Sequence, residues 1–435
     1  MSTLTLLLIC SKVKTKINYL LIRVITMNIT GIITEYNPFH LGHEFHLENC
    51  RKDTKCDAVI CIMSGNFVQR GLPAITDKWS RTKMALEAGI DLVIELPTIY
   101  AVSSAEYFAF GAISLLNSLS VVDNIYFGSE AGDTKLIKLI ANILNDEPKE
   151  FKIFLKESLS LGNPYPKARA YSLKKYISEV LKLNINLENI SEFLNSSNNI
   201  LGIEYCKSLL KLNSPIKTFT LKREGSNYNS KEINKNKFAS ATAIRESIYT
   251  NNSIKATKEF LPGFTYNILN SKNSFSSLES MFNYIKYILT LDPSKLSLIS
   301  DASEGLDNKI LNELKNSNSF EELISRCKSK RYTYTRISRV LCQLFLGFDE
   351  NLNKLKKSEP SYIRVLGLSE TGAKILKDIK NNSNINIITK VPKKISDPIL
   401  ELDIKATNLY SLLNPDIKIN SDYLISPIIK KDNNM

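Results

Sequence analysis

Short and almost entirely apolar runs recur along the first part of this chain, and helical segments separate them. The runs are residues 29–36 (ITGIITEY), 57–64 (DAVICIMS), 91–96 (DLVIEL) and 124–128 (NIYFG). Strands with so few polar residues are buried on both faces, which is typical of parallel sheets covered by helices. Because these strands alternate with helices, the sequence predicts an α/β fold with a doubly wound parallel sheet.

The segments between these runs have the features of helices. We expect helices over 42–52, 78–89 and 104–119, because Gly89 suits a helix end and Ser104 suits a helix start. Each of these helices would cross from one strand to the next, as a parallel sheet requires.

Further along, residues 133–183 are expected to be mostly helical, and 201–212 to form another helix. Residues 217–222 (KTFTLK) alternate and predict a fifth strand. The polar, Asn-rich stretch 226–237 predicts a loop, and 241–249 returns to a helical pattern.

The composition divides the chain into three parts. Residues 1–26 contain a short apolar run followed by lysines. The run is too short to span a membrane, and a signal peptide carries its basic residues before the apolar core. We interpret 1–26 as an extension from a wrongly assigned start, with Met27 as the natural first residue. We expect residues 27–270 to form the α/β domain and 271–435 to form a mostly helical region.

The net charge is +13 and the pI is about 9.1. Such a charge favours a polyanionic partner, with nucleic acid ahead of a membrane surface. The alternative is a compositional bias, because lysine is common throughout the chain. Charge alone does not decide between the two.

The chain has seven cysteines, and no two of them form a C-x-x-C pair. An odd number without paired spacing argues against a disulfide framework and against a zinc site made of cysteines. A reducing, cytoplasmic location is the simplest interpretation, and no membrane association is expected.

All three histidines of the chain, His40, His43 and His46, lie within seven residues. A metal site is one interpretation, but Gly42 lies inside the cluster and no nearby cysteine completes a ligand set. We therefore predict no metal site. The histidines follow the first strand, and nucleotides bind at the carboxyl ends of parallel strands. A helix that starts here would direct its N-terminus and the imidazoles at phosphate, and imidazoles titrate near neutrality.

A second element near the end of the α/β domain fits the same chemistry. Ser240 and Thr242 lie at the start of the helix expected over 241–249, and Arg245 follows on its first turn. The hydroxyls can cap the helix and bind phosphate, and the guanidinium adds a fork of donors. The alternative is an ordinary capped helix at the surface.

Three motifs together resemble one known family. Residues 35–43 (EYNPFHLGH), 64–71 (SGNFVQRG) and 198–205 (NNILGIEY) resemble the bacterial tRNA(Met) cytidine acetate ligases. The resemblance runs from about residue 28 into the C-terminal region. It implies a HUP-type nucleotidyltransferase domain. It also implies a ligase that adenylates acetate with ATP and passes the acetyl group to N4 of wobble cytidine 34 in elongator tRNA(Met).

The resemblance also implies an ATP site, with Mg²⁺ expected alongside the nucleotide. His40 and His43 would be catalytic and would stabilise charge on the phosphoryl oxygens. The ATP-binding residues would be Ile33, Thr34, Glu35, Tyr36, Asn37, Pro38, Phe39, His40, Leu41, Gly42, His43, Glu44, Phe45, His46, Gly128, Asn198 and Arg223.

Some of these residues have simpler explanations. Gly128 suits an ordinary turn at a strand end, Asn198 a helix cap, and Arg223 a solvated surface. Lys78 and Arg81 follow a loop and could contact phosphate or acetate, although charged residues there are also typical of a solvated helix start.

A basic stretch in the second half of the chain has tyrosines between its charges. We expect it to contact tRNA, since cations suit phosphate and aromatic rings suit unstacked bases. The alternative is a solvated face. The expected contacts are Lys328, Lys330, Arg331, Arg336 and Arg339.

Two other functions stay open. The chain could be a small-molecule nucleotidyltransferase, but the large basic C-terminal region exceeds what such an enzyme needs. It could also be a non-catalytic RNA-binding protein, but the complete His40-x-Gly42-His43 motif argues against that. The sequence does not indicate the oligomeric state, the acetate-binding residues or the basis of tRNA selection.

Overall fold

The computed structural model describes residues 27–185, 188–223, 239–251 and 253–431. The expectations for residues 1–26 and for the loop at 226–237 lie outside these ranges. An eight-stranded sheet forms the centre of the molecule, with strand order β10-β8-β5-β2-β1-β6-β7 and β9 beside β8. The strands of this sheet are β1 (Ile29–Thr34), β2 (Ala58–Ser64), β5 (Leu92–Leu96), β6 (Asn124–Ser129), β7 (Lys217–Lys222), β8 (Tyr362–Leu368), β9 (Asn386–Ile388) and β10 (Ile428–Ile429).

The parallel doubly wound arrangement predicted from the apolar runs is confirmed for β5, β2, β1, β6 and β7. Strand β2 shows why its run lacks polar residues. Ile60 and Ile62 belong to the core on one face of the sheet, and Val59 and Cys61 belong to the core on the other. Since side chains alternate along a strand, burial on both faces requires an apolar residue at nearly every position.

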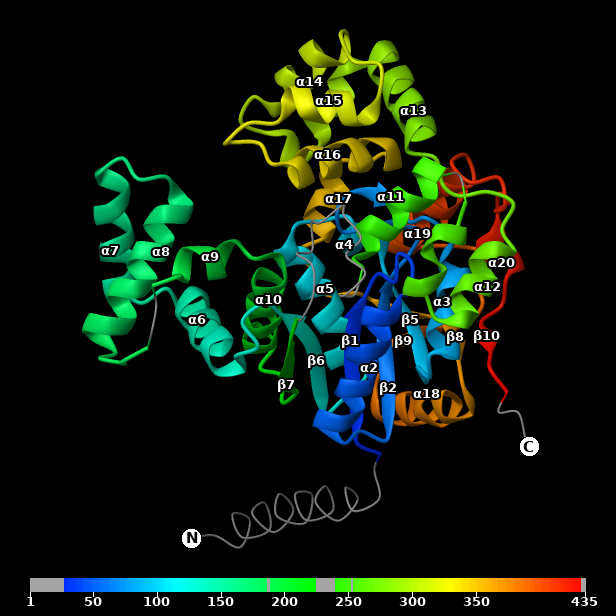
Figure 1. Cartoon of the computed structure of the whole chain (residues 1–435), viewed down its shortest axis with the longest axis horizontal. Coiled ribbons are helices and arrows are strands. Elements are labelled where there is room, and N and C mark those ends of the chain that lie inside the picture. The colour runs from blue at the N-terminus through cyan, green and yellow to red at the C-terminus, as the bar shows by residue number, and fades with distance from the viewer. Residues whose placement is uncertain (1–26, 186–187, 224–238, 252, 432–435) are drawn as a thin grey trace, which may run out of the picture.

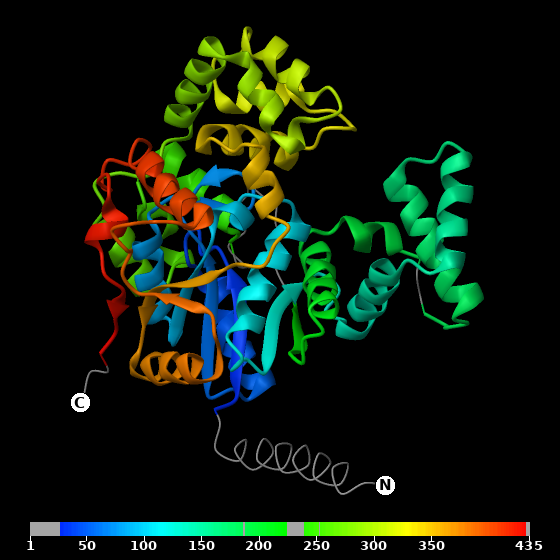
Figure 2. The same ribbon diagram turned by 180° about the vertical axis from the view of Figure 1, so that it is seen from behind.

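Helices cover both faces of this sheet, as Figures 1 and 2 show from opposite sides. Helices α2 and α3 pack on one face and α5 and α18 on the other. The helices of the first half are α2 (Leu41–Thr54), α3 (Lys78–Glu87), α4 (Thr98–Ala101), α5 (Ala105–Ser118), α6 (Thr134–Asp146), α7 (Lys149–Ser160), α8 (Tyr165–Lys175), α9 (Ile190–Asn195) and α10 (Ser197–Lys211). The helices that follow β7 are α11 (Ala241–Asn251), α12 (Gly263–Asn270), α13 (Leu278–Leu291), α14 (Leu306–Leu314), α15 (Phe320–Cys327), α16 (Tyr334–Leu346), α17 (Glu350–Leu355), α18 (Glu370–Asn382), α19 (Pro398–Tyr410) and α20 (Ser421–Leu424).

The expected domain boundary near residue 270 is wrong. Strand β8 comes from the C-terminal region but pairs antiparallel with β5, with Leu92 opposite Leu368 and Glu95 opposite Arg364. Strand β10 then adds to β8. The C-terminal region therefore completes the central sheet and also supplies the helices α13–α17, which lie beyond the carboxyl ends of the parallel strands (Figure 1).

Helices α7, α8 and α9 project to one side of the molecule (Figure 1). Helices α7 and α8 come from the stretch 133–183 that the sequence predicted to be mostly helical, whereas α9 lies beyond it. At the start of α5, Ser104 is the N-cap residue, but its side chain accepts no capping hydrogen bond. Among the described residues, we find no helix with both the length and the apolar character needed to cross a bilayer.

The two-stranded hairpin β3 (Phe67–Val68) and β4 (Leu72–Pro73) connects the sheet to the C-terminal helices. Its turn residue Gly71 has φ of +72°, and a Cβ there would lie 2.5 Å from backbone atoms of Arg339. Ser338 of α16 donates a hydrogen bond of 3.0 Å to the Gly71 carbonyl oxygen. The turn is thus clamped to α16 by close backbone contact.

This clamp predicts that Gly71→Ala is strongly destabilising. The substitution adds left-handed strain and a backbone clash, and we expect it to lower the free energy of unfolding by about 3 kcal/mol or more. Gly162→Ala is the matched control, since Gly162 has a similar φ of +78° but nothing within 4 Å of an added Cβ. It should cost only about 1–2 kcal/mol. Urea unfolding measures both, and equal losses would contradict the clamp.

Candidate active site

A cavity of about 210 Å³ opens at the carboxyl ends of β1 and β6. The strand order changes direction between these two strands, which is where doubly wound sheets bind nucleotides. The structure brings most of the predicted ATP-binding residues to this cavity. Those that line it are Ile33, Thr34, Glu35, Tyr36, Asn37, His40, Gly42, His43, Phe45, His46, Gly128, Asn198 and Arg223, together with Ser240, Thr242 and Arg245.

Four residues of the predicted set, Pro38, Phe39, Leu41 and Glu44, do not line the cavity. Phe39 is fully buried, and its ring packs 4.7 Å from that of Tyr36. The Asn37–Pro38 peptide bond is cis. Phe39 therefore supports the loop from beneath.

The two histidines of the H-x-G-H motif cap helix α2 reciprocally. The Gly42 amide donates to His40 Nδ1 at 3.0 Å, and the His40 amide donates to His43 Nδ1 at 3.3 Å. The rings stack with centroids 3.8 Å apart. A neutral imidazole that accepts at Nδ1 carries its proton at Nε2. Both rings can therefore donate an Nε2 hydrogen bond to a phosphate oxygen beside the helix N-terminus.

The histidines are held neutral, which corrects the expectation that they titrate near neutrality. Burial, together with the charges of Arg223 and Arg245, lowers the pKa of His40 to about 3. Burial and the charge of Arg223 lower the pKa of His46 to about 4. Burial and His40 place the pKa of His43 well below its ordinary value. The positive charge of the site is therefore on the arginines.

The start of α11 closes the cavity from the side opposite α2. The Ser240 hydroxyl accepts the Ala243 amide at 3.1 Å, so it caps the helix as the sequence predicted. Arg245 donates to the Asn37 carbonyl oxygen at 2.7 Å and to the Thr242 hydroxyl at 3.2 Å. The guanidinium thus ties the helix to the loop that carries the histidines.

Sequence reasoning missed Glu130, which orients Asn198. One carboxylate oxygen of Glu130 accepts two hydrogen bonds from Asn198. The backbone amide donates at 3.2 Å, and the side-chain Nδ2 donates at 2.8 Å. The other carboxylate oxygen accepts the Asn199 backbone amide at 2.9 Å. Because the Asn198 Nδ2 is engaged in this way, its Oδ1 is the atom that can accept a hydrogen bond from a ligand. The position of Glu130 just after Gly128 was the available signal.

Gly128 gives Arg223 the room it needs beside the cavity. An added Cβ at Gly128 would lie 3.3 Å from Arg223 Cγ. The Arg223 backbone amide donates to the Ser129 carbonyl oxygen at 2.9 Å, which extends the pairing of β7 with β6. Arg223 therefore lies close enough to lower the pKa of each histidine.

The comparisons with known proteins agree with this geometry. The family model for the HIGH Nucleotidyl Transferase matches residues 27–423. The tRNA(Met) cytidine acetate ligase of Clostridium perfringens (strain SM101 / Type A) is 59% identical over 403 residues, which cover 93% of this chain and 100% of that protein. That of Clostridium novyi (strain NT) is 53% identical over 409 residues, again 93% of this chain and 100% of that protein. The chain belongs to the tRNA(Met) cytidine acetate ligase family.

Solved structures of this family extend the agreement to the whole fold. Thermotoga maritima TmcAL (apo, form I) matches with a TM-score of 0.85 and 33% identity, over 93% of this chain and 100% of that chain. The same protein bound with alpha-thio ATP (form II) matches with a TM-score of 0.83 and 33% identity over the same shares. The α/β nucleotidyltransferase fold and the family resemblance expected from the sequence are confirmed.

Lys78 and Arg81 were expected to contact phosphate or acetate, and the structure contradicts this. Both side chains are fully buried and neither lines the cavity. Lys78 Nζ lies 2.7 Å from Glu95 and 2.8 Å from Asp422. Arg81 donates to the backbone carbonyl oxygens of Glu35, Ser64, Gly65 and Thr76. The start of α3, whose N-cap residue is Asp77, therefore stabilises the fold through these contacts.

The basic stretch expected to contact tRNA is only partly free to do so. Arg336 donates to Glu304 at 2.9 Å and to the backbone of Asp301 and Ser303. Arg339 is half-buried, and burial lowers the pKa of its guanidinium. Lys328, Lys330 and Arg331 are exposed, so they are the members that a polyanion can reach.

Tyr332 and Tyr334, which the sequence suggested for stacking on bases, are also engaged. The Tyr332 hydroxyl donates to the Glu304 carbonyl oxygen, and only 8% of Tyr332 is exposed. The Tyr334 hydroxyl donates to Glu321 at 2.6 Å.

Across the described ranges, no group of three or more His, Cys, Asp and Glu residues could hold a metal ion.

The neutral histidines predict an acid-sensitive fold. The unfolded chain takes up these protons near pH 6.5, whereas folded His46 does so at about 4 and His40 at about 3. Between the pKa of the unfolded histidines and the lower pKa values of the folded ones, the unfolded state binds more protons than the folded state does. The free energy of unfolding should therefore fall as the pH drops below 6.5, by about 1.4 kcal/mol per pH unit and proton.

Urea unfolding at pH 7, 6 and 5 measures this slope. His46→Gln removes one of the titrating imidazoles. The free energy of unfolding should then depend less steeply on pH, by the contribution of about one proton. An identical slope in the two proteins would contradict the assignment.

Proposed function

We propose that this chain is an ATP-dependent ligase that forms N4-acetylcytidine in tRNA. In this proposal it adenylates acetate to acetyl-AMP and transfers the acetyl group to cytidine 34 of elongator tRNA(Met). The observation that carries the proposal is the pair of stacked histidines at the N-terminus of α2, with both Nδ1 atoms engaged and both Nε2 atoms available as donors. The relatives in the family bear the name of this activity, and the solved relative binds alpha-thio ATP.

The cavity offers the groups that the first step needs. An acetate oxygen attacks the α-phosphorus of ATP, the bond from this phosphorus to pyrophosphate breaks, and acetyl-AMP forms. Charge on the phosphoryl oxygens is stabilised by the Nε2 donors of His40 and His43 and by the guanidinium groups of Arg223 and Arg245. The Oδ1 of Asn198 accepts a hydrogen bond from the amine of adenine or a ribose hydroxyl.

Mg²⁺ enters this scheme as part of the substrate, bound to the phosphates of ATP. The described residues supply no cluster of carboxylates that would hold the ion by themselves, and magnesium commonly shares one or two protein ligands with substrate phosphates. No side chain needs to carry the acetyl group, because acetyl-AMP is itself an activated acyl donor.

The basic surface provides for the second substrate. Lys328, Lys330 and Arg331 are exposed on the segment between α15 and α16. A single-stranded anticodon loop presents its bases without the opening of a duplex, so cytidine can reach the acyl donor while phosphates contact the lysines. These residues are proposed as tRNA contacts.

The protein should incorporate labelled acetate into total tRNA in the presence of ATP and Mg²⁺. It should also catalyse acetate-dependent exchange of pyrophosphate into ATP. Exchange without labelled tRNA would indicate a different acceptor and favour a small-molecule substrate. Neither activity would indicate a binding protein and overturn the proposal.

Two substitutions at His43 separate its chemical role from its capping role. His43→Gln can keep the cap, since glutamine at this helix position reaches back to the N-cap amide, but it lacks the imidazole donor. His43→Ala loses both. If the imidazole stabilises the transition state, both variants should lose about 100-fold or more of the exchange rate. Exchange near the wild-type rate in His43→Gln would show that capping is the whole role.

Glu130 should control the affinity for ATP through Asn198. Glu130→Ala leaves the Asn198 amide free to rotate, and we expect the KM for ATP in the exchange reaction to rise about 10-fold. Glu204→Ala is the matched control, because Glu204 lies on α10, the helix that carries Asn198, but pairs with Lys207 at 2.9 Å. An unchanged KM in Glu130→Ala would contradict the orienting role.

A further inference from the structure

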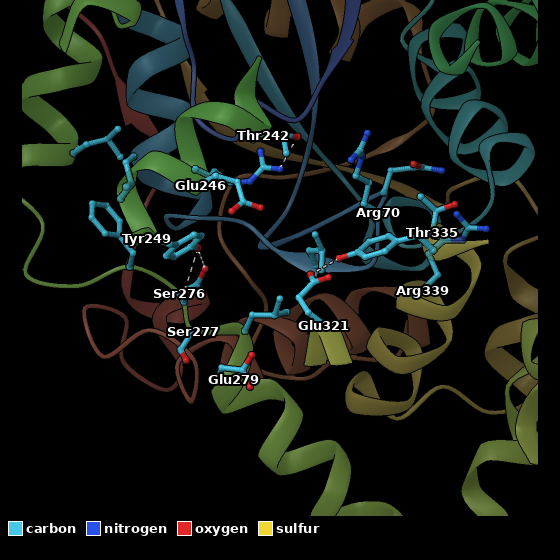
Figure 3. A pocket seen from close by; sticks show the side chains of 18 of the residues that line it. Arg70, Thr242, Glu246, Tyr249, Ser276, Ser277, Glu279, Glu321, Thr335 and Arg339 are labelled. Carbon is cyan, nitrogen blue, oxygen red and sulfur yellow. Dashed lines mark hydrogen bonds between the residues drawn. The ribbon is translucent and has the colours of Figure 1, made fainter. Parts of the chain in front are cut away.

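The cavity of about 210 Å³ that His40 and His43 line is called the nucleotide cavity below. A second and larger cavity, a groove of about 1490 Å³, adjoins it. Its walls come from both halves of the chain: α11 on one side, and α15 with the start of α16 on the other (Figure 3). Seven residues line both spaces, so the two cavities meet at a shared neck. These residues are Gln69, Arg70, Leu72, Asn198, Leu201, Thr242 and Arg245.

One face of α11 leads from the nucleotide cavity into the groove. Thr242, Arg245, Glu246 and Tyr249 all line the groove, and their spacing places them on one side of the helix. Thr242 and Arg245 also line the nucleotide cavity, whereas Glu246 does not. Glu246 is thus the first carboxylate on this helix beyond the neck, about 6 Å along the axis from Thr242.

The opposite wall faces Glu246 closely enough to interact with it. Burial and the hydrogen bond to Glu321 raise the pKa of Tyr334, and the charges of Glu246 and Arg70 also act on this phenol. Figure 3 shows Thr242, Glu246 and Tyr249 along one side of the pocket and Arg70, Thr335 and Arg339 across from them. A carboxylate and a guanidinium therefore face each other across the groove near its neck.

The clamp at Gly71 fixes this arrangement. Arg70 precedes Gly71, whose carbonyl oxygen accepts the hydrogen bond from Ser338 on α16. The same helix carries Tyr334, at its first residue, and Arg339. The backbone of Arg70 is therefore fixed relative to α16. The fold thus sets the distance between Arg70 and Glu246.

We propose that Glu246 is the catalytic base of the acetyl-transfer step and that it binds the exocyclic amine of the acceptor cytosine at the neck of the groove. This inference rests on the proposed function. A cytosine presents N4 as a donor and N3 and O2 as acceptors. A carboxylate recognises the N4 amine, and the guanidinium of Arg70 donates to O2 or N3. This pairing reads the Watson–Crick edge of a base that has left its stack.

The step balances with Glu246 as the proton acceptor. The bond from cytosine N4 to the acetyl carbon forms, and the bond from that carbon to the phosphate oxygen of AMP breaks. AMP leaves with the electron pair of that bond, and one N4 proton passes to the carboxylate of Glu246. Such a base is expected to contribute about 10²- to 10⁴-fold to the rate.

Two other carboxylates line the groove and are poorer candidates. Glu321 accepts the Tyr334 hydroxyl at 2.6 Å and lies on α15, no residue of which lines the nucleotide cavity. Glu279 lies on α13, and neither it nor any other residue of that helix lines the nucleotide cavity. Of the three carboxylates that line the groove, only Glu246 shares a helix with residues of the neck, Thr242 and Arg245.

The test compares Glu246→Gln with Glu279→Gln in the two half-reactions. Glu246→Gln should keep acetate-dependent pyrophosphate exchange within about twofold of wild type, which also shows that it folds. Its kcat for acetylation of tRNA should fall at least 100-fold, with the KM for tRNA changed by less than about threefold. Glu246→Asp should recover part of the rate. Glu279→Gln should retain both activities.

Each contrary result is decisive. Acetylation by Glu246→Gln within threefold of wild type would overturn the role of Glu246. A joint loss of exchange and transfer would also overturn it, because the residue would then serve the first step or the fold. If the wild-type protein performs exchange but acetylates no tRNA, the proposed function itself fails, and the inference falls with it.

Discussion

The guanidinium of Arg81 holds the backbone together at the carboxyl ends of β1 and β2. It is fully buried and donates to carbonyl oxygens of the loops that follow the two strands. The loop with His40 starts directly after Glu35, one of the residues that Arg81 binds, so the position of the imidazoles depends on this cation. Lys78, one turn earlier on α3, pairs with Glu95 and Asp422 and so connects the same helix to the C-terminal segment. Removal of one partner from such a buried set leaves an uncompensated charge, which is far more costly than the loss of a surface pair.

Much of the fold could be predicted because its strands are buried on both faces. In β2 nearly every position must be apolar, so the run 57–64 predicts a buried strand. The motif 37–43 could be placed at the ligand edge because it follows such a strand. Strand β8 shows the limit of this reasoning. It lies in residues 271–435, which were expected to form a separate, mostly helical region. Nothing in residues 362–368 indicates that β5, some 270 positions earlier, is the partner. Pairing over that distance depends on which sheet edge the other strands leave open.

Charged residues were the least predictable part of the site. Lys78 and Arg336 occur in patterns typical of solvated or ligand-binding cations, yet each is bound by acids from distant segments. Which partners the fold provides for a cation is a property of tertiary contacts, and a short sequence pattern does not reveal it. Glu130 illustrates the converse. It has no motif of its own beyond its position close to Gly128, and its importance follows from the position of α10, which brings Asn198 to its carboxylate.

The division of labour within the nucleotide cavity follows from its electrostatics. Arg223 and Arg245 carry the positive charge, and they hold the buried histidines neutral. A neutral imidazole fixed at Nδ1 contributes a directed donor at Nε2 and no further charge. In the proposed function, the arginines therefore attract the nucleotide, and the histidines discriminate between geometries of its phosphate. A cavity of about 210 Å³ can enclose such chemistry, but it cannot admit a folded RNA. The groove of about 1490 Å³ beside it can receive a single displaced base. Because the hairpin containing Gly71 is clamped to α16, the C-terminal helices set the width of the passage between the two spaces.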